Sequence, residues 1–250
     1  MNANLVQLRR GILLAVLLTP LAPAPPAMES SVPFRAGETL NYRVAWSAFS
    51  SAASLELSVP ERRDLFGRPT WHLRATAHTM NTVRSLFTID DQSDSYSDTA
   101  TFESRQYELH LNELGKKQDE ILHFTPTGKA SLAPGPVVAV PPGTYDPLGA
   151  LYALRGVDWR RAQEFHITVC DGHDVYEISA RLDASGETVA VDAGNFTANR
   201  ISIHVYQRGK EVTANSYKVW LAEDSARTPV KMQAVLPLGN IRAELTRATQ

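Results

Sequence analysis

Short segments in which apolar and polar residues alternate recur along most of the chain. The first is Leu40–Trp46, which reads Leu-Asn-Tyr-Arg-Val-Ala-Trp. Because successive side chains of a strand point to opposite faces, this period of two is typical of a strand with one face on a core and one in water. The later segments of this kind are Ser54–Val59, Thr70–Ala77, Ser104–Leu111, Glu120–Phe124, Phe165–Val169, Val175–Leu182, Ala198–Tyr206, Ser216–Leu221, Val230–Leu236 and Ile241–Leu245. Separated by turn formers, they predict an all-β, mainly antiparallel fold, either a sandwich or a wide, incomplete barrel.

Two stretches interrupt this strand pattern with helical spacing. Asp146 is followed by Pro147 and by an apolar face that continues to Arg155, so an N-cap and a proline at the first position predict a short helix there. A second short helix is indicated over His78–Phe87. We expect these one or two helices to pack against the opening of a curved sheet.

The sequence also predicts the type of several connections between these strands. Asp171-Gly172 lies between two alternating segments and predicts a tight hairpin. Ala184-Ser185-Gly186 predicts another turn, and the Pro- and Ala-rich stretch 128–143 predicts a long loop, with an inter-domain linker as the alternative.

The first 27 residues are typical of a cleavable secretory signal peptide. The pair Arg9-Arg10 precedes the apolar run Gly11–Leu18, and a Pro- and Ala-rich end leads to a cut after Ala27. The run is too short to span a bilayer, which takes roughly 20 apolar residues. Cys170 is the single cysteine, so the chain has neither an internal disulfide nor a lipid-attachment cysteine near the cut. We therefore expect an exported periplasmic protein with one domain over residues 28–250 and no membrane span.

The charge balance argues against a nucleic-acid partner. Of 25 basic residues, removal of Arg9 and Arg10 would leave 23, against 27 acidic ones. A weak acidic surplus does not form the basic stripe that phosphate neutralisation needs.

Local clusters of reactive residues are better explained by structural roles than by catalysis or metal binding. Cys170–Asp174 groups a thiol, an imidazole and carboxylates, but adjacent residues on a turn splay outward, so a polar hairpin tip is favoured over a nucleophile or zinc site. His110 and His123 could lie side by side on neighbouring strands, but two imidazoles alone make a poor metal site. The acidic run Asp90, Asp91, Asp94 and Asp98 lacks the order of a calcium loop, so a solvated acidic strand entry is favoured and weak calcium binding is the lesser alternative. The sequence predicts no catalytic residue, no metal and no cofactor.

One set of aromatic and charged residues suits an amphiphile or a sugar, because such ligands present an apolar face and a polar edge together. The candidate ligand-binding residues are Trp46, Tyr152, Arg155, Trp220, Asp224 and Arg227. The structural alternative is that both tryptophans anchor the core, that residues 224–227 form a turn, and that Arg155 pairs with a carboxylate that holds the helix.

Three stretches in this order resemble the DUF3108 family of bacterial envelope proteins. They are Phe34–Tyr42, the helix Asp146–Arg155, and Val219–Lys231 followed by Gly239 and Leu245. Where the family has a glycine shortly after the first strand, this chain has Ala48, Ala52 and Ala53. The resemblance implies a periplasmic, β-rich protein with no established activity.

These observations favour a non-enzymatic binding or carrier module for a lipid, a glycan or another envelope component. An interaction protein of an envelope assembly is the second hypothesis, and a hydrolase is the third. The oligomeric state is left open by the sequence.

Overall fold

The computed structural model describes residues 32–84, 88–213, 215–237 and 239–249. The predicted signal peptide, residues 1–27, and its cut after Ala27 lie outside the described residues. Within the described ranges no helix combines the length and the apolar character needed to cross a membrane.

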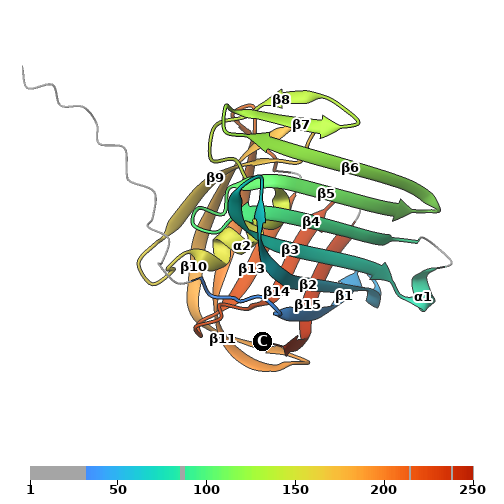
Figure 1. Cartoon of the computed structure of the whole chain (residues 1–250). Helices are drawn as coiled ribbons and strands as arrows, with labels where there is room; N and C mark the ends of the chain where they lie inside the picture. Colours follow the sequence, from blue (N-terminus) through green and yellow to red (C-terminus); the bar gives the residue numbers. More distant parts are fainter. Residues whose placement is uncertain (1–31, 85–87, 214, 238, 250) are drawn as a thin grey trace, which may run out of the picture.

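A single antiparallel sheet forms the body of the molecule (Figure 1). Its first half is a meander of β1 (Thr39–Trp46), β2 (Phe49–Leu65), β3 (Arg68–Thr79), β4 (Asp90–Asp98), β5 (Ser104–Glu113), β6 (Lys116–Thr125), β7 (Lys129–Ala133) and β8 (Val137–Ala139). Its second half contains β9 (Glu164–Cys170), β10 (Val175–Val191), β11 (Gly194–Gln207), the short β12 (Lys210–Glu211), β13 (Ser216–Ala222), β14 (Pro229–Leu236) and β15 (Gly239–Thr249). β1 pairs with β15 and joins the halves, and the sheet ends at β8 and β9 without closing.

The predicted fold class is therefore confirmed, since the sheet is curved, mainly antiparallel and open. All eleven alternating segments lie in strands, and Asp171-Gly172 connects β9 to β10 as predicted. Strand β4 was predicted only as a solvated acidic strand entry, because its side chains are almost all Asp and Ser. Its polar groups are instead paired within the protein.

Two predicted connections are wrong. Ala184–Gly186 is a bulge inside the long β10, where the register with β11 shifts and Gly186 takes a φ of +70°, and the chain turns only after Val191. The predicted long loop 128–143 contains β7 and β8, because β7 continues the meander onto β6. Sequence alternation did not reveal these strands because they are short and rich in Ala and Val.

Two helices accompany the sheet. α2 (Pro147–Gly156) confirms the predicted helix, with Asp146 as the N-cap that accepts a hydrogen bond from the Gly149 amide. α1 (Asn81–Arg84) lies within the predicted second helix, whose first residues belong to β3 and whose residues 85–87 lie outside the described residues. Figure 1 shows α2 inside the curve, between the layer of β3–β6 and the layer of β9–β14.

The segment before α2 links β5 to β9, the strand at one open end of the sheet. The Thr144 carbonyl accepts a hydrogen bond from the Ser104 amide of β5. Tyr145 then exchanges main-chain hydrogen bonds with Thr168 and Cys170 of β9. The connection thus fills part of the seam and leads directly into α2, which fixes the helix within the curve.

The core is densest where α2 meets β1–β5. The ring of Phe34 contacts those of Trp71, Phe102 and Tyr152 edge to face, with centroids 5.3, 5.6 and 4.9 Å apart. Such aromatic packing contributes about 0.5–1.5 kcal/mol per pair beyond the buried area. This half of the interior is filled by side chains, whereas the half under β9–β15 is not.

Candidate functional site: an apolar groove beside a buried ion pair

An apolar groove of about 400 Å³ lies between α2 and the inner face of the second half of the sheet. Helix α2 contributes Leu151 and Leu154, and the strands contribute mostly branched aliphatic side chains, among them Leu55, Ile178, Ile203, Val205, Val219, Met232 and Ile241. Volumes of this size fall in the range of small-molecule sites.

The groove follows from alternation along the strands. Ile203 of β11 lies opposite Tyr217 of β13, and Val219 lies opposite Met232 of β14, so these four side chains share the inner face. Ile203, Met232 and Leu151 are only half-buried. They face space that α2 does not fill, because its ten residues cover only part of a sheet this wide.

The lining of the groove is poor in reactive groups. The described residues that line it include no Asp, Glu, His, Ser or Cys, and the groups that could donate or accept a hydrogen bond there belong to Tyr217, Lys218 and Gln233. The arrangement of mostly aliphatic side chains can bind an apolar chain.

A fully buried ion pair lies behind the groove. The two terminal nitrogens of Arg155 donate to the Glu38 carboxylate at 2.6 and 2.9 Å, and both side chains are about 1% exposed. The guanidinium also lies over the rings of Phe34 and Tyr152, at 5.2 and 5.1 Å from their centroids. Glu38 is therefore the carboxylate partner that the structural alternative for Arg155 requires.

Four of the six predicted ligand-binding residues lie close together. Tyr152 and Arg155 are completely buried, and the Tyr152 hydroxyl donates to the Ser58 carbonyl. Arg227 donates to the last carbonyls of α2, at Arg155 and Gly156, while Asp224 accepts from the amides of its own turn. Asp224 and Arg227 also line a separate polar cleft of about 540 Å³.

The two tryptophans lie elsewhere. The Trp220 indole donates to Glu187 at 2.8 Å, and Lys231 lies 4.6 Å from its ring centre. Trp46 ends β1 and stacks on Phe49 with centroids 6.2 Å apart. Ligand binding by the six residues stays a prediction. Alternation placed the groove residues on an inward face but could not show that the space before them is unfilled.

Other clusters named from the sequence separate in the structure. His110 faces Asp119 and His123 faces Gln106, so the two histidines do not lie side by side. A two-residue turn at Leu114-Gly115, both with positive φ, sets that register. Cys170 is fully buried, and this burial raises the pKa of its thiol and so lowers the thiolate fraction at neutral pH.

The acidic run of β4 is divided among separate protein partners. Asp90 pairs with Arg84, Asp91 accepts the Asn112 amide and Asp98 pairs with Arg105, so the run is no calcium loop. Asp94, with Glu108 and His110 of β5, places three donor atoms within 4.8 Å of one another. The oxygens of Asp94 already accept protein hydrogen bonds, so this group has a sufficient role without a metal.

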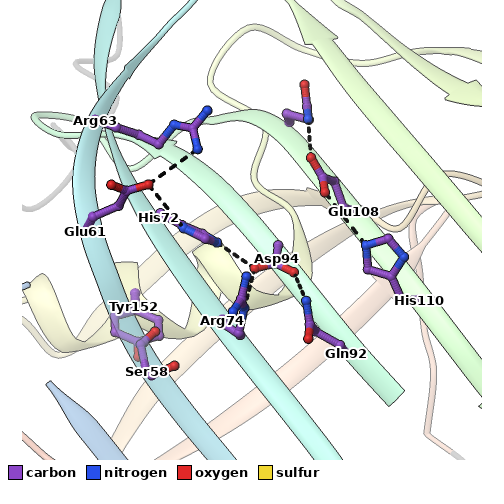
Figure 2. Close-up of polar contacts among 11 residues, drawn as sticks. Ser58, Glu61, Arg63, His72, Arg74, Gln92, Asp94, Glu108, His110 and Tyr152 are labelled. Carbon is purple, nitrogen blue, oxygen red and sulfur yellow. Dashed lines mark hydrogen bonds and ion pairs between the residues drawn. The ribbon is translucent and has the colours of Figure 1, made fainter. Parts of the chain in front are cut away.

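Figure 2 shows Asp94 at the centre of a polar network on the outer face. Its carboxylate contacts the imidazole of His72 at 2.5 Å, the guanidinium of Arg74 at 2.7 Å and the amide of Gln92 at 2.6 Å. Burial alone would raise the pKa of Asp94, but these three hydrogen bonds outweigh it and lower the pKa to about 2. The network stabilises β3 against β4.

Acid should therefore weaken the fold through Asp94. Because the folded pKa lies below the ordinary 3.8, the unfolded chain binds more protons, and stability present above pH 4 is lost as the pH falls toward 2. The loss is on the order of 2 kcal/mol. Urea unfolding at pH 7, 4 and 2.5 measures the free energy of unfolding. Its fall below pH 4 that is due to Asp94 should be present in the wild type and absent from Asp94→Asn. Equal pH dependence of the two proteins would contradict it.

Comparison with known proteins places this architecture. The structure resembles a β-barrel-like protein of the domain of unknown function DUF1849 from Brucella abortus, with a TM-score of 0.57 and 12% identity over 90% of this chain and 99% of that one. A "putative lipoprotein" from Parabacteroides distasonis aligns with a TM-score of 0.40 and 9% identity over 88% and 100%. Sequence identities this low support a similarity of fold and nothing more.

Sequence comparison is more specific. No curated protein matches the chain. The pattern of the DUF3108 family, described as proteins of unknown function, matches residues 41–246, which include every strand from β2 to β14. The resemblance seen in the sequence is thereby confirmed, and the chain belongs to the DUF3108 family.

Proposed function

We propose that this protein is an exported, periplasmic carrier that binds the acyl chain of a lipid in the apolar groove. The observation that carries the proposal is the unfilled aliphatic lining beside α2, of about 400 Å³. Burying apolar surface is favourable by about 0.8 kcal/mol per methylene group, so a chain of several methylenes gains enough to bind. The described lining residues include no carboxylate, imidazole, serine or cysteine, which favours binding over hydrolysis.

Native mass spectrometry of the protein purified from periplasm tests the carrier directly. A complex whose added mass is that of a lipid is expected, on a polypeptide that lacks residues 1–27. A protein that stays empty after exposure to membrane lipid extract would refute the carrier. A polypeptide that retains its first 27 residues would refute the predicted cut.

A groove variant locates the lipid. Ile203→Trp fills the groove and should weaken binding of dansyl-undecanoate by at least about tenfold, which is about 1.4 kcal/mol. Ser202→Trp is the matched control, because Ser202 is the next residue of β11 and points to the opposite face. Fluorescence titration with palmitate as competitor measures both. Equal affinity in the two variants would place the ligand outside the groove.

The sheet edge supports the second hypothesis, docking to an envelope protein. β8 ends the sheet and exposes 62% of Val137, and unpaired edges of this kind can accept another strand. We also propose that Asp224 and Arg227 bind a ligand in their polar cleft, as the sequence predicts. A stable protein complex without lipid in the native spectrum would favour docking over the carrier.

A further inference from the structure

A second groove, of about 840 Å³, lies on the outer face of β9 and β10. The turn between β4 and β5 forms one wall through Thr101 and Glu103, and Tyr145 lies beside it. The outward-facing side chains of β9, β10 and β11 form the floor and the other wall. The apolar groove lies on the inner face of these strands, and Ile167 and Ile178 contribute to the lining of both grooves.

Ser179 is the unusual residue of this outer groove. It is only 4% exposed, and its hydroxyl has no hydrogen-bond partner in the described part of the chain. A buried hydroxyl without a partner is unfavourable, and most such groups in native proteins are satisfied by protein or another molecule. Ser179 lines the groove, so a ligand that enters can supply the missing partner.

The neighbours of Ser179 do not satisfy it. His166 and His204 flank it on the adjacent strands. Each imidazole is engaged by a carboxylate instead, His166 with Glu164 at 3.1 Å and His204 with Glu211 at 2.7 Å. The row is therefore unlike a catalytic triad, in which the histidine must bond the serine. These three residues are suited to binding a ligand.

The rest of the lining mixes rings with polar groups of both charges. The Tyr145 hydroxyl donates to the Thr101 carbonyl at 2.9 Å, which holds its ring at the wall, and Tyr206 lines the groove from β11. Glu103 offers an acceptor, and Arg181 carries donors. Opposite charges together disfavour a ligand with a large charge of either sign. Tyrosine rings suit the apolar faces of sugar rings, and the polar groups suit their hydroxyls.

We propose that this outer groove binds a neutral glycan, with Ser179 as a hydrogen-bonding residue in its floor. The proposal does not depend on the lipid carrier, because Ser179, Tyr145 and Tyr206 line this groove and not the apolar one. It assigns to the protein two ligands of different chemistry.

Titration with three neutral tetrasaccharides, chitotetraose, cellotetraose and maltotetraose, tests it by calorimetry and by amide chemical shifts of the ¹⁵N-labelled mature protein. Saturable binding of at least one is expected, with shifts concentrated in β9 and β10. Ser179→Ala should weaken binding about fivefold, the factor that one neutral hydrogen bond provides. Tyr206→Ala should weaken it further through loss of the ring.

The control is Ser202→Ala on β11, whose hydroxyl donates to Asp183 at 2.8 Å and does not line the groove. It should bind glycan like the wild type. Ser179→Ala should melt at the same or a higher temperature, because it removes a group that the folded chain leaves unpaired. No saturable binding of the three sugars, equal affinity of Ser179→Ala and wild type, or a lowered melting temperature for Ser179→Ala would each overturn the proposal.

Discussion

Arg155→Met is expected to lower the free energy of unfolding by about 3–5 kcal/mol, because it leaves the carboxylate of Glu38 buried without a cation. Arg155 also donates to the Ala226 carbonyl, so its loss removes the hydrogen bond that ties α2 to the turn after β13. Glu38→Leu should cost a similar amount by leaving the guanidinium unpaired. Urea unfolding followed by tryptophan fluorescence measures both changes.

Two controls separate this pair from charge loss in general. Arg43→Met breaks the pair with Asp192, in which both side chains are about 40–50% exposed, and should cost less than about 1 kcal/mol. The double variant Glu38→Leu with Arg155→Met should recover much of the loss, since no unpaired charge remains. If Arg155→Met kept wild-type stability and lost lipid binding, Arg155 would be a ligand residue as first predicted.

Asp146→Ala should destabilise the fold by more than about 2 kcal/mol. The Asp146 carboxylate caps α2 at the Gly149 amide and accepts from the hydroxyls of Ser95 and Ser104, one on each of two neighbouring strands. Loss of an N-cap costs about 1 kcal/mol, and loss of the buried acceptor for the hydroxyls of Ser95 and Ser104 adds to this cost. Chemical denaturation at pH 7 gives the difference, and a change below about 0.5 kcal/mol would contradict the proposed role.

Asp146→Asn provides the matched comparison, because it keeps an acceptor and removes the charge. Burial raises the pKa of Asp146 above its ordinary 3.8, although its hydrogen bonds oppose this shift. As the pH falls, the carboxylate of Asp146 in the folded protein therefore binds a proton at a higher pH than it does in the unfolded chain. Stability of the wild type relative to Asp146→Asn should rise as the pH falls through the raised pKa toward 3.8, opposite in sign to the effect of Asp94.

Glu38 and Asp146 illustrate what local sequence can and cannot show. Asp146 was recognisable as an N-cap because the proline follows it directly and the apolar face lies within the next ten residues. Nothing local joined Glu38 to Arg155, since 117 positions separate them and only the curvature of the sheet brings them together. Likewise, β4 reads as a solvated acidic run until Arg74 and His72 are placed opposite it.

The sequence by itself determined the eleven strands that show alternation, the Asp171-Gly172 hairpin, helix α2 and the family, because each of these depends on residues close together in the chain or on their order along it. Only the tertiary structure decided that β1 pairs with β15 and that α2 leaves part of the inner face unfilled. The physical reason is that alternation tells which side chains share a face. How far a sheet curves, and whether that face meets side chains or empty space, depends on contacts between distant strands.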